Sequence, residues 1–166
     1  MSNCITQACA AALLAFSLMA SSTVPGSAEG VRPVVSASGI IAARSAYGME
    51  ETVARLKKDI AAKGITFFQE IDQSALASKA RIELRPSILL IFGNPPLGTQ
   101  FITANPQAGL DWPVRLLVYR DAAGAVWTAY TDFAWIAKRH GVNSRDMQFH
   151  MASEVAASIV SSVAAH

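Results

Sequence analysis

The fold is decided by residues 84–113, LRPSILLIFGNPPLGTQFITANPQAGLDWP. This stretch contains a five-residue apolar run, Ile88 to Phe92, which Pro86 precedes and Gly93 follows. A run this short between two breaking residues is typical of a strand that is buried on both faces. We therefore expect a central strand of a sheet here. The polar excursion that follows, residues 93–111, is punctuated by Gly and Pro, and it carries three of the six candidate site residues.

Upstream of this stretch, the sequence predicts a strand at residues 40–45, a helix at 49–63 and a strand at 65–72. In the helix, apolar residues recur every three or four positions on one face, and Gly64 ends it. In the second strand, apolar and polar residues alternate, with Phe67 and Ile71 on the same side, as in a half-buried strand. Asp72 is placed to cap a short helix.

Downstream, residues 114–120 and 126–131 predict two strands, and the Asp-Ala-Ala-Gly loop between them predicts an antiparallel hairpin. Asp132 is placed to cap the helix that follows. A last helix begins at Ser144 and carries apolar residues four apart, from Met147 to Val163. Such a stripe is expected to pack along a sheet.

The elements follow the order strand, helix, four strands and helix, with small helices in the connections. Because the later strands are joined by a hairpin, this order predicts an α+β domain: a single antiparallel sheet with helices on one face. Within the excursion, Thr99 is placed to cap a short turn that Pro106 ends.

The first 28 residues contain no acidic, basic or histidine residue. Their apolar stretch, residues 8–20, is shorter than the ~20 residues that span a bilayer, and it suits the core of a signal peptide. We expect a signal peptide at 1–28, cleaved after Ala28 or alternatively after Ala20, a linker at 29–38 and a single domain at 39–166. The protein is then periplasmic or secreted in a bacterium, without stable membrane insertion after cleavage. Because no Lys or Arg precedes the apolar stretch, an N-terminal membrane anchor is the alternative.

Composition and charge exclude several classes of function. Both cysteines, Cys4 and Cys9, fall in the leader, so the processed chain has no disulfide, catalytic thiolate or thiolate metal site. The chain has 14 basic and 12 acidic residues, a formal net charge of +2, and the basic residues are scattered. We therefore expect no nucleic-acid surface. A small-molecule ligand or a protein partner remains.

We expect no cofactor and no metal. His150 and Glu154 are four apart and share a helix face, which suits two ligands of a metal, but a third ligand would have to come from elsewhere. Residues 93–99, GNPPLGT, look like a phosphate-binding loop, yet they lack its Lys, and two prolines remove amide donors.

Six polar residues are the candidates for binding a ligand: Asp72, Gln73, Asn94, Thr99, Asp111 and Tyr130. The first hypothesis is an exported, non-enzymatic module that binds a small molecule or a protein partner through the excursion. The alternative is an enzyme of unassigned class that uses Asp72 and Asp111 as acid and base groups, which requires both carboxylates to open onto one pocket. We expect Asn94 to shape the loop and Asp111 to be available to a ligand. Trp112 is among the aromatic residues that could line a pocket, although such residues more often fill a core.

Several segments together resemble the domain-of-unknown-function family 302 (DUF302). They are ETVARL at 51–56, LRPSILLIFGNP at 84–95, Gly98-Thr99, and Leu110-Asp111 with Pro113, within a match over about residues 45–141. The resemblance implies a β-α-β4-α fold similar to the TATA-box-binding-protein class, and a homodimer, since similar folds form dimers. It implies no reaction. Gln73 stands where the family pattern has a histidine, so a titrating imidazole beside Asp72 is not expected.

Overall fold

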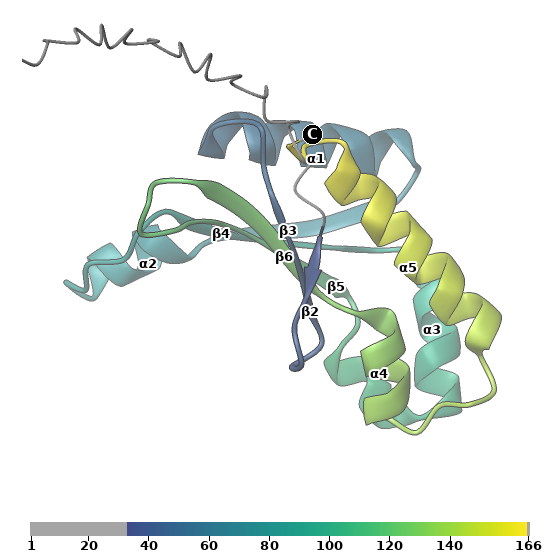
Figure 1. Ribbon diagram of the computed structural model, residues 1–166. Coiled ribbons are helices and arrows are strands. Elements are labelled where there is room, and N and C mark those ends of the chain that lie inside the picture. Colours follow the sequence, from purple (N-terminus) through teal and green to yellow (C-terminus); the bar gives the residue numbers. More distant parts are fainter. Residues whose placement is uncertain (1–32, 166) are drawn as a thin grey trace, which may run out of the picture.

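The computed structural model describes residues 33–165, and residues 1–32 and 166 lie outside the described part. The predicted signal peptide, both of its possible cleavage sites and the first part of the predicted linker lie outside it as well. The described residues form one antiparallel sheet with helices packed against it, which confirms the α+β prediction (Figure 1).

The six strands pair in the order β1-β2-β6-β5-β4-β3, and each is antiparallel to its neighbours. Their bounds are β1 (Val34–Val35), β2 (Ile40–Arg44), β3 (Thr66–Asp72), β4 (Ser87–Gly93), β5 (Val114–Arg120) and β6 (Val126–Thr131). β1 falls inside the predicted linker, so the sheet begins earlier in the chain than the sequence indicated.

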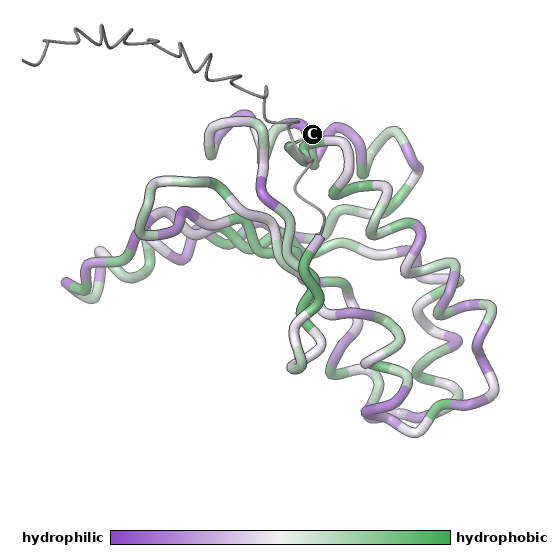
Figure 2. The backbone as a smooth tube through the Cα atoms, in the orientation of Figure 1, coloured by the Kyte–Doolittle hydropathy of each residue, from purple (hydrophilic) through white to green (hydrophobic). Residues whose placement is uncertain are grey.

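The helices are α1 (Met49–Ala62), α2 (Gln73–Lys79), α3 (Pro95–Ala104), the 3-10 helix η1 (Pro106–Leu110), α4 (Phe133–Arg139) and α5 (Asp146–Ser161). α1 and α5 pack on one face of the sheet, α3 and α4 pack against α5, and α2 contacts β4 at the end of the sheet (Figure 1). The tube coloured by hydropathy shows hydrophobic segments where the strands meet these helices (Figure 2).

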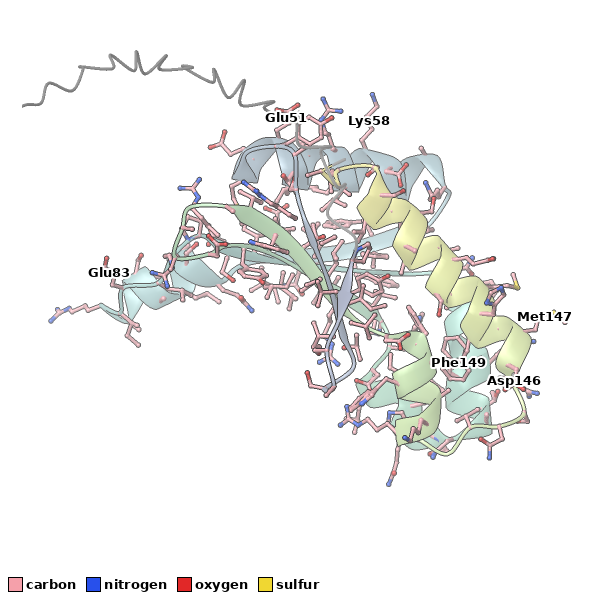
Figure 3. The ribbon with its side chains drawn as sticks, in the orientation of Figure 1. Glu51, Lys58, Glu83, Asp146, Met147 and Phe149 are labelled. Atoms are coloured by element: carbon pink, nitrogen blue, oxygen red, sulfur yellow. The ribbon has the colours of Figure 1, made fainter. Side chains whose placement is uncertain are left out.

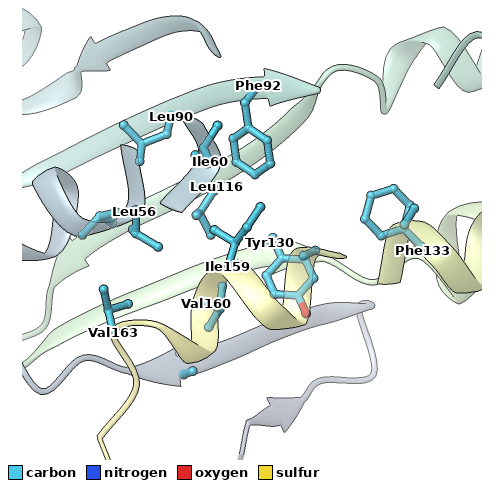
Figure 4. Close-up of a cluster of buried hydrophobic side chains, with 14 of the residues drawn as sticks. Leu56, Ile60, Leu90, Phe92, Leu116, Tyr130, Phe133, Ile159, Val160 and Val163 are labelled. Carbon is cyan, nitrogen blue, oxygen red and sulfur yellow. The ribbon is translucent and has the colours of Figure 1, made fainter. Parts of the chain in front are cut away.

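The core lies between the sheet and the helices. Leu56 and Ile60 of α1, Leu90 of β4 and Ile159 of α5 are 0% exposed, and Leu116 of β5 is 1% exposed (Figure 4). Burying each such aliphatic side chain contributes about 1.5–3 kcal/mol. The predicted helix at 49–63 is confirmed, and its apolar stripe is the part that enters this core.

β4 contains the apolar run Ile88 to Phe92. It lies between β3 and β5, as expected of an interior strand. It is buried on one face only, because Leu90 and Phe92 are 0% and 2% exposed whereas Leu89 and Ile91 are half-buried. The prediction of burial on both faces is therefore wrong. The cause is that α1 and α5 cover a single face of the sheet.

β3 contains a β-bulge between Phe67 and Gln69. The extra residue moves the side chains beyond it to the opposite face, so Phe67 faces the helices and Ile71 faces away from them. The prediction that these two share a face is wrong for this reason. Phe68, inside the bulge, is 45% exposed.

α3 begins earlier than predicted, at Pro95, and Asn94 caps it by accepting a hydrogen bond from Leu97 N at 3.3 Å. Pro95 and Pro96 suit the first helical positions, where an N–H has no helical partner and φ is already fixed. The predicted cap, Thr99, instead lies inside the helix and donates to Pro95 O at 2.8 Å.

α5 presents a different face from the predicted one. Met147 is 71% exposed and points away from the protein, whereas Phe149 is 4% exposed and points toward α3 (Figure 3). A stripe with a spacing of four drifts by about 40° at each step around a helix of 3.6 residues per turn. Its far end, Ile159 and Val163, therefore enters the core while its first residue does not.

The face of the sheet away from α1 and α5 is called the open face below. One row of directly paired residues crosses it from β1 to β3: Val34, Ala42, Ala129, Leu117, Leu89 and Ile71. All six are apolar, and we call them the apolar row. Leu117 also lines a depression beside residues 83–87, so this face is accessible.

Candidate functional site

Two glycines of the excursion hold the indole of Trp112. A Cβ on Gly98 would lie 1.9 Å from Trp112 Nε1, and a Cβ on Gly93 would lie 3.0 Å from the same atom. Any side chain at Gly98 would therefore occupy the place of the indole. This contact explains why residues 93 and 98 are glycines. The indole of Trp112, which precedes β5, fills the space that a side chain at either position would need.

A hollow of about 380 Å³ opens beside this indole, between the end of β4, α3 and α5. Three aromatic rings and small or branched aliphatic side chains form most of its wall: Ile65, Phe92, Leu97, Phe101, Val114, Phe133, Ala152, Val155 and Ala156. Its size is near the lower end of the range for small-molecule pockets, about 300–1,000 Å³. An apolar ligand of modest size has room here.

Four exposed polar residues surround the hollow: Lys63, Asn94, Glu154 and Ser158. Lys63 Nζ is paired with Asp59 Oδ2 at 2.6 Å, and Glu154 Oε1 with His150 Nε2 at 3.1 Å. The ammonium group of Lys63 is therefore paired with a carboxylate, and the carboxylate of Glu154 contacts an imidazole. The wall is apolar, and its polar groups lie at the edge.

Asp111 is buried in a separate cluster of charged side chains. Its side chain is 4% exposed, and its Oδ2 lies 2.6 Å from His140 Nε2 and 3.1 Å from Arg139 Nη1. Arg115 Nη2 donates to its Oδ1 at 3.2 Å. The carboxylate therefore joins the end of η1 to α4 and to β5. A general base has to reach a substrate, and the His140 side chain is also only 4% exposed.

Sequence reasoning missed His140 and Arg139 as partners of Asp111. The chain separates them from Asp111 by 29 and 28 residues, so no local spacing signals the contact. Asn105 Nδ2 donates to His140 O at 2.8 Å and adds a second link between the excursion and α4.

Asp72 and Gln73 lie at the other end of β4. Asp72 caps α2 as predicted, accepting from Ala75 N at 2.8 Å and from Ser74 Oγ at 2.6 Å. The bond from Ser74 is the main cause that holds the pKa of Asp72 below its usual value. Gln73 Oε1 accepts from Ser87 Oγ at 2.7 Å.

The structure does not bring the two candidate carboxylates together. Asp72 pairs with Ile88 at the start of β4, whereas Asp111 precedes β5, whose first residue Val114 pairs with Phe92 at the end of β4. The hollow is lined by neither of them. The geometry that the enzyme alternative requires is therefore missing from residues 33–165.

The remaining candidates are divided between the surface and the core. Thr99 is exposed on α3, and Tyr130 of β6 is 5% exposed in the core, where burial raises its pKa. Asn94 lines the hollow, as does Trp112. His150 and Glu154 form an exposed pair, and the described residues contain no group of three His, Cys, Asp or Glu side chains that could hold a metal ion.

Comparison with known proteins places the chain in a family. The model of the family described as "Domain of unknown function DUF302" matches residues 41–165, from β2 through α5. The chain therefore belongs to the DUF302 family. The fold is also that of the crystal structure of an uncharacterized conserved DUF302 protein from Bacillus stearothermophilus. The TM-score is 0.69 at 15% identity, over 75% of this chain and 98% of that one.

Curated relatives carry another name. Over 105 residues, 63% of this chain, the sequence is 36% identical to a protein named fluoride-specific ion channel FluC 1 from Brucella suis biovar 1 (strain 1330). It is equally similar to the protein of that name from Brucella abortus biovar 1 (strain 9-941). The matched residues cover 41% and 39% of those two proteins, so the chain spans about two fifths of their length. Within residues 33–165 of this chain, none of the helices has the length and apolar character needed to cross a membrane.

Proposed function

We propose that this DUF302 domain is a non-enzymatic module that binds a small, largely apolar molecule in the hollow beside Trp112. The hollow itself carries the proposal, since a concave apolar site with few polar groups at its edge is the usual form of a small-molecule site. The packing of Trp112 on Gly93 and Gly98 supports it, because this contact keeps one wall in place.

Neighbouring residues of α5 allow a matched test. Ser158 and Ala157 are both exposed, but only Ser158 lines the hollow. Ethylbenzene at millimolar concentration is expected to raise the thermal midpoint of the wild type and of Ala157→Trp, and to leave that of Ser158→Trp unchanged. Equal shifts for both variants, or no shift for the wild type, would contradict binding in the hollow.

The proposal includes export to the bacterial envelope, which the uncharged apolar leader supports. N-terminal sequencing of the protein from a periplasmic extract is expected to begin at Glu29. A chain that begins at Met1 and sediments with membranes would favour the anchor.

The names of the Brucella relatives support a second candidate, namely that this domain works beside a fluoride-specific ion channel. The hollow is a poor site for fluoride itself, because this strongly hydrated anion needs several donors, and the wall is mostly apolar. The expected link is therefore a protein contact.

Deleting the gene is expected to raise the sensitivity of the bacterium to sodium fluoride, and returning the wild-type gene is expected to restore tolerance. Unchanged growth in fluoride would oppose this candidate.

The homodimer also remains a proposal, and the open face supports it. Along the apolar row, Ala42 and Ala129 occupy one half, and Leu89 and Leu117 the other. A two-fold axis parallel to the strands would place the small residues of one copy against the large residues of the other. Such a self-complementary surface is what an isologous interface requires.

A further inference from the structure

Trp112 brings a hydrogen-bond donor to the wall of the hollow. Within residues 33–165, Arg145 Nε is the one fully buried side-chain nitrogen or oxygen that lacks a partner. Trp112 lines the hollow, and its indole N–H donates no hydrogen bond to any of the described residues. Trp127, by contrast, donates its indole N–H to Asp121 Oδ2 at 2.8 Å. A ligand that places an acceptor against this N–H is expected to bind more tightly than a ligand of the same shape without one.

The start of α3 offers no site for an anion, although it borders the hollow. Pro95 and Pro96 have no N–H, and the N–H groups of Leu97 and Gly98 both donate to Asn94 O, at 3.1 and 2.8 Å. The backbone N–H groups that bind anions at other helix N-termini are therefore either missing or already hydrogen-bonded within the protein. Because Lys63 and Glu154 at the rim are also paired, nothing here favours a charged ligand.

The walls favour a flat ring. Phe92 and Phe133 present their rings to the core from the sheet and from α4 (Figure 4), and both line the hollow. Phe101 is held in place by stacking on Phe149, with ring centroids 4.2 Å apart. α5 contributes the small side chains of Ala152 and Ala156 to the same wall. Aromatic rings pack well against such aromatic walls.

From these contacts we infer that the hollow selects a neutral aromatic molecule that carries a hydrogen-bond acceptor, and that Trp112 Nε1 donates to this acceptor. This inference rests on the proposed function and adds the class of ligand to it. Asn94, whose side chain lies at the rim, is already used as the helix cap. The inference assigns the selectivity between ligands of the same shape to the indole rather than to Ser158, the exposed hydroxyl at the rim.

The test compares probes of nearly equal shape. Acetophenone has a carbonyl acceptor, cumene replaces it by an apolar group, and benzoate carries a charge. The wild type is expected to bind acetophenone about tenfold more tightly than cumene, the effect of about one hydrogen bond, and more tightly than benzoate. Trp112→Phe keeps a ring but removes the N–H, so its preference for acetophenone over cumene is expected to fall below about threefold.

A second measurement does not depend on a variant. Acetophenone is expected to shift the indole N–H resonance of Trp112 in the wild type, and cumene to shift it much less. Equal binding of the two probes, blocked by Ser158→Trp, would overturn the inference and leave the proposed function intact. A preference that survives in a folded Trp112→Phe would overturn it too. If no probe binds the wild type, both the proposed function and the inference fail.

Discussion

At the residue level, Gly98 shows how one missing side chain shapes the site. In an open helical position, Gly→Ala stabilises by up to about 1 kcal/mol. At Gly98 the added Cβ would meet Trp112 Nε1 at 1.9 Å. We therefore expect Gly98→Ala to destabilise the protein by about 1–3 kcal/mol, as overpacking does, and to weaken ethylbenzene binding.

The control for Gly98 is Gly109→Ala, whose Cβ would lie 3.8 Å from Ile102, at ordinary contact distance. It is expected to change the free energy of unfolding by less than about 0.5 kcal/mol. Urea unfolding measures both variants. Similar free energies of unfolding for the two variants would show that the indole of Trp112 can move away from residue 98 without destabilising the protein.

Asp111 is expected to support the fold rather than a ligand. Replacing it by Ala leaves the buried side chain of His140 without its hydrogen-bond partner and is expected to cost about 1–3 kcal/mol. Arg115, whose side chain is 49% exposed, is the control, and Arg115→Ala is expected to cost less than about 1 kcal/mol. Thermal unfolding separates the two. A stable Asp111→Ala variant would restore Asp111 as a free binding residue.

The candidate site was only partly predictable from single residues. The caps at Asp72 and Asp132 were predicted correctly, because a cap depends on neighbours within three positions. The partners of Asp111, and the packing of Trp112 on Gly93 and Gly98, could not be predicted, because they join segments that meet only in the folded chain. Thr99 was misplaced because the two prolines before it start the helix rather than precede it.

At the element level, the two faces of β4 are expected to differ in stability. Phe92 is 2% exposed, so Phe92→Ala is expected to cost about 3–5 kcal/mol. Ile91 is half-buried on the open face, and Ile91→Ala is expected to cost clearly less, about 1–2 kcal/mol. Lys58 points into solvent from α1 (Figure 3), and Lys58→Ala is expected to change stability by less than about 0.5 kcal/mol. Equal effects at Phe92 and Ile91 would mean that the open face is covered in solution.

Element types were easier to predict than the faces that elements bury. Periodicity and breaking residues predicted α1, the hairpin of β5 and β6, and the presence of β2, β3 and β4, since these signals are local. The bulge in β3 has no such signal, because it reflects pairing with β4 rather than the sequence of β3 alone. The buried face of α5 was mispredicted because a spacing of four does not follow one side of a helix.

At the level of the whole molecule, the proposed homodimer depends on the open face. If two copies join through the apolar row, Leu117→Glu places a charge in the interface and is expected to yield a monomer in sedimentation equilibrium. Leu110, 68% exposed and outside that face, provides the control, because Leu110→Glu is expected to remain dimeric. A monomeric wild type, or dimers of both variants, would rule out this interface.

The bulge in β3 bears on protein aggregation. Sheets polymerise into fibrils when a straight outer strand offers its unpaired backbone groups to another molecule. Here one outer strand, β1, has two residues, and the other, β3, is interrupted between Phe67 and Gln69. Within residues 33–165, neither border of the sheet is a regular template for an added strand. If two copies pair through the open face as proposed, the pair is not extended by strand addition at these borders. Deleting Phe68 to remove the bulge is expected to offer a continuous border for fibril growth.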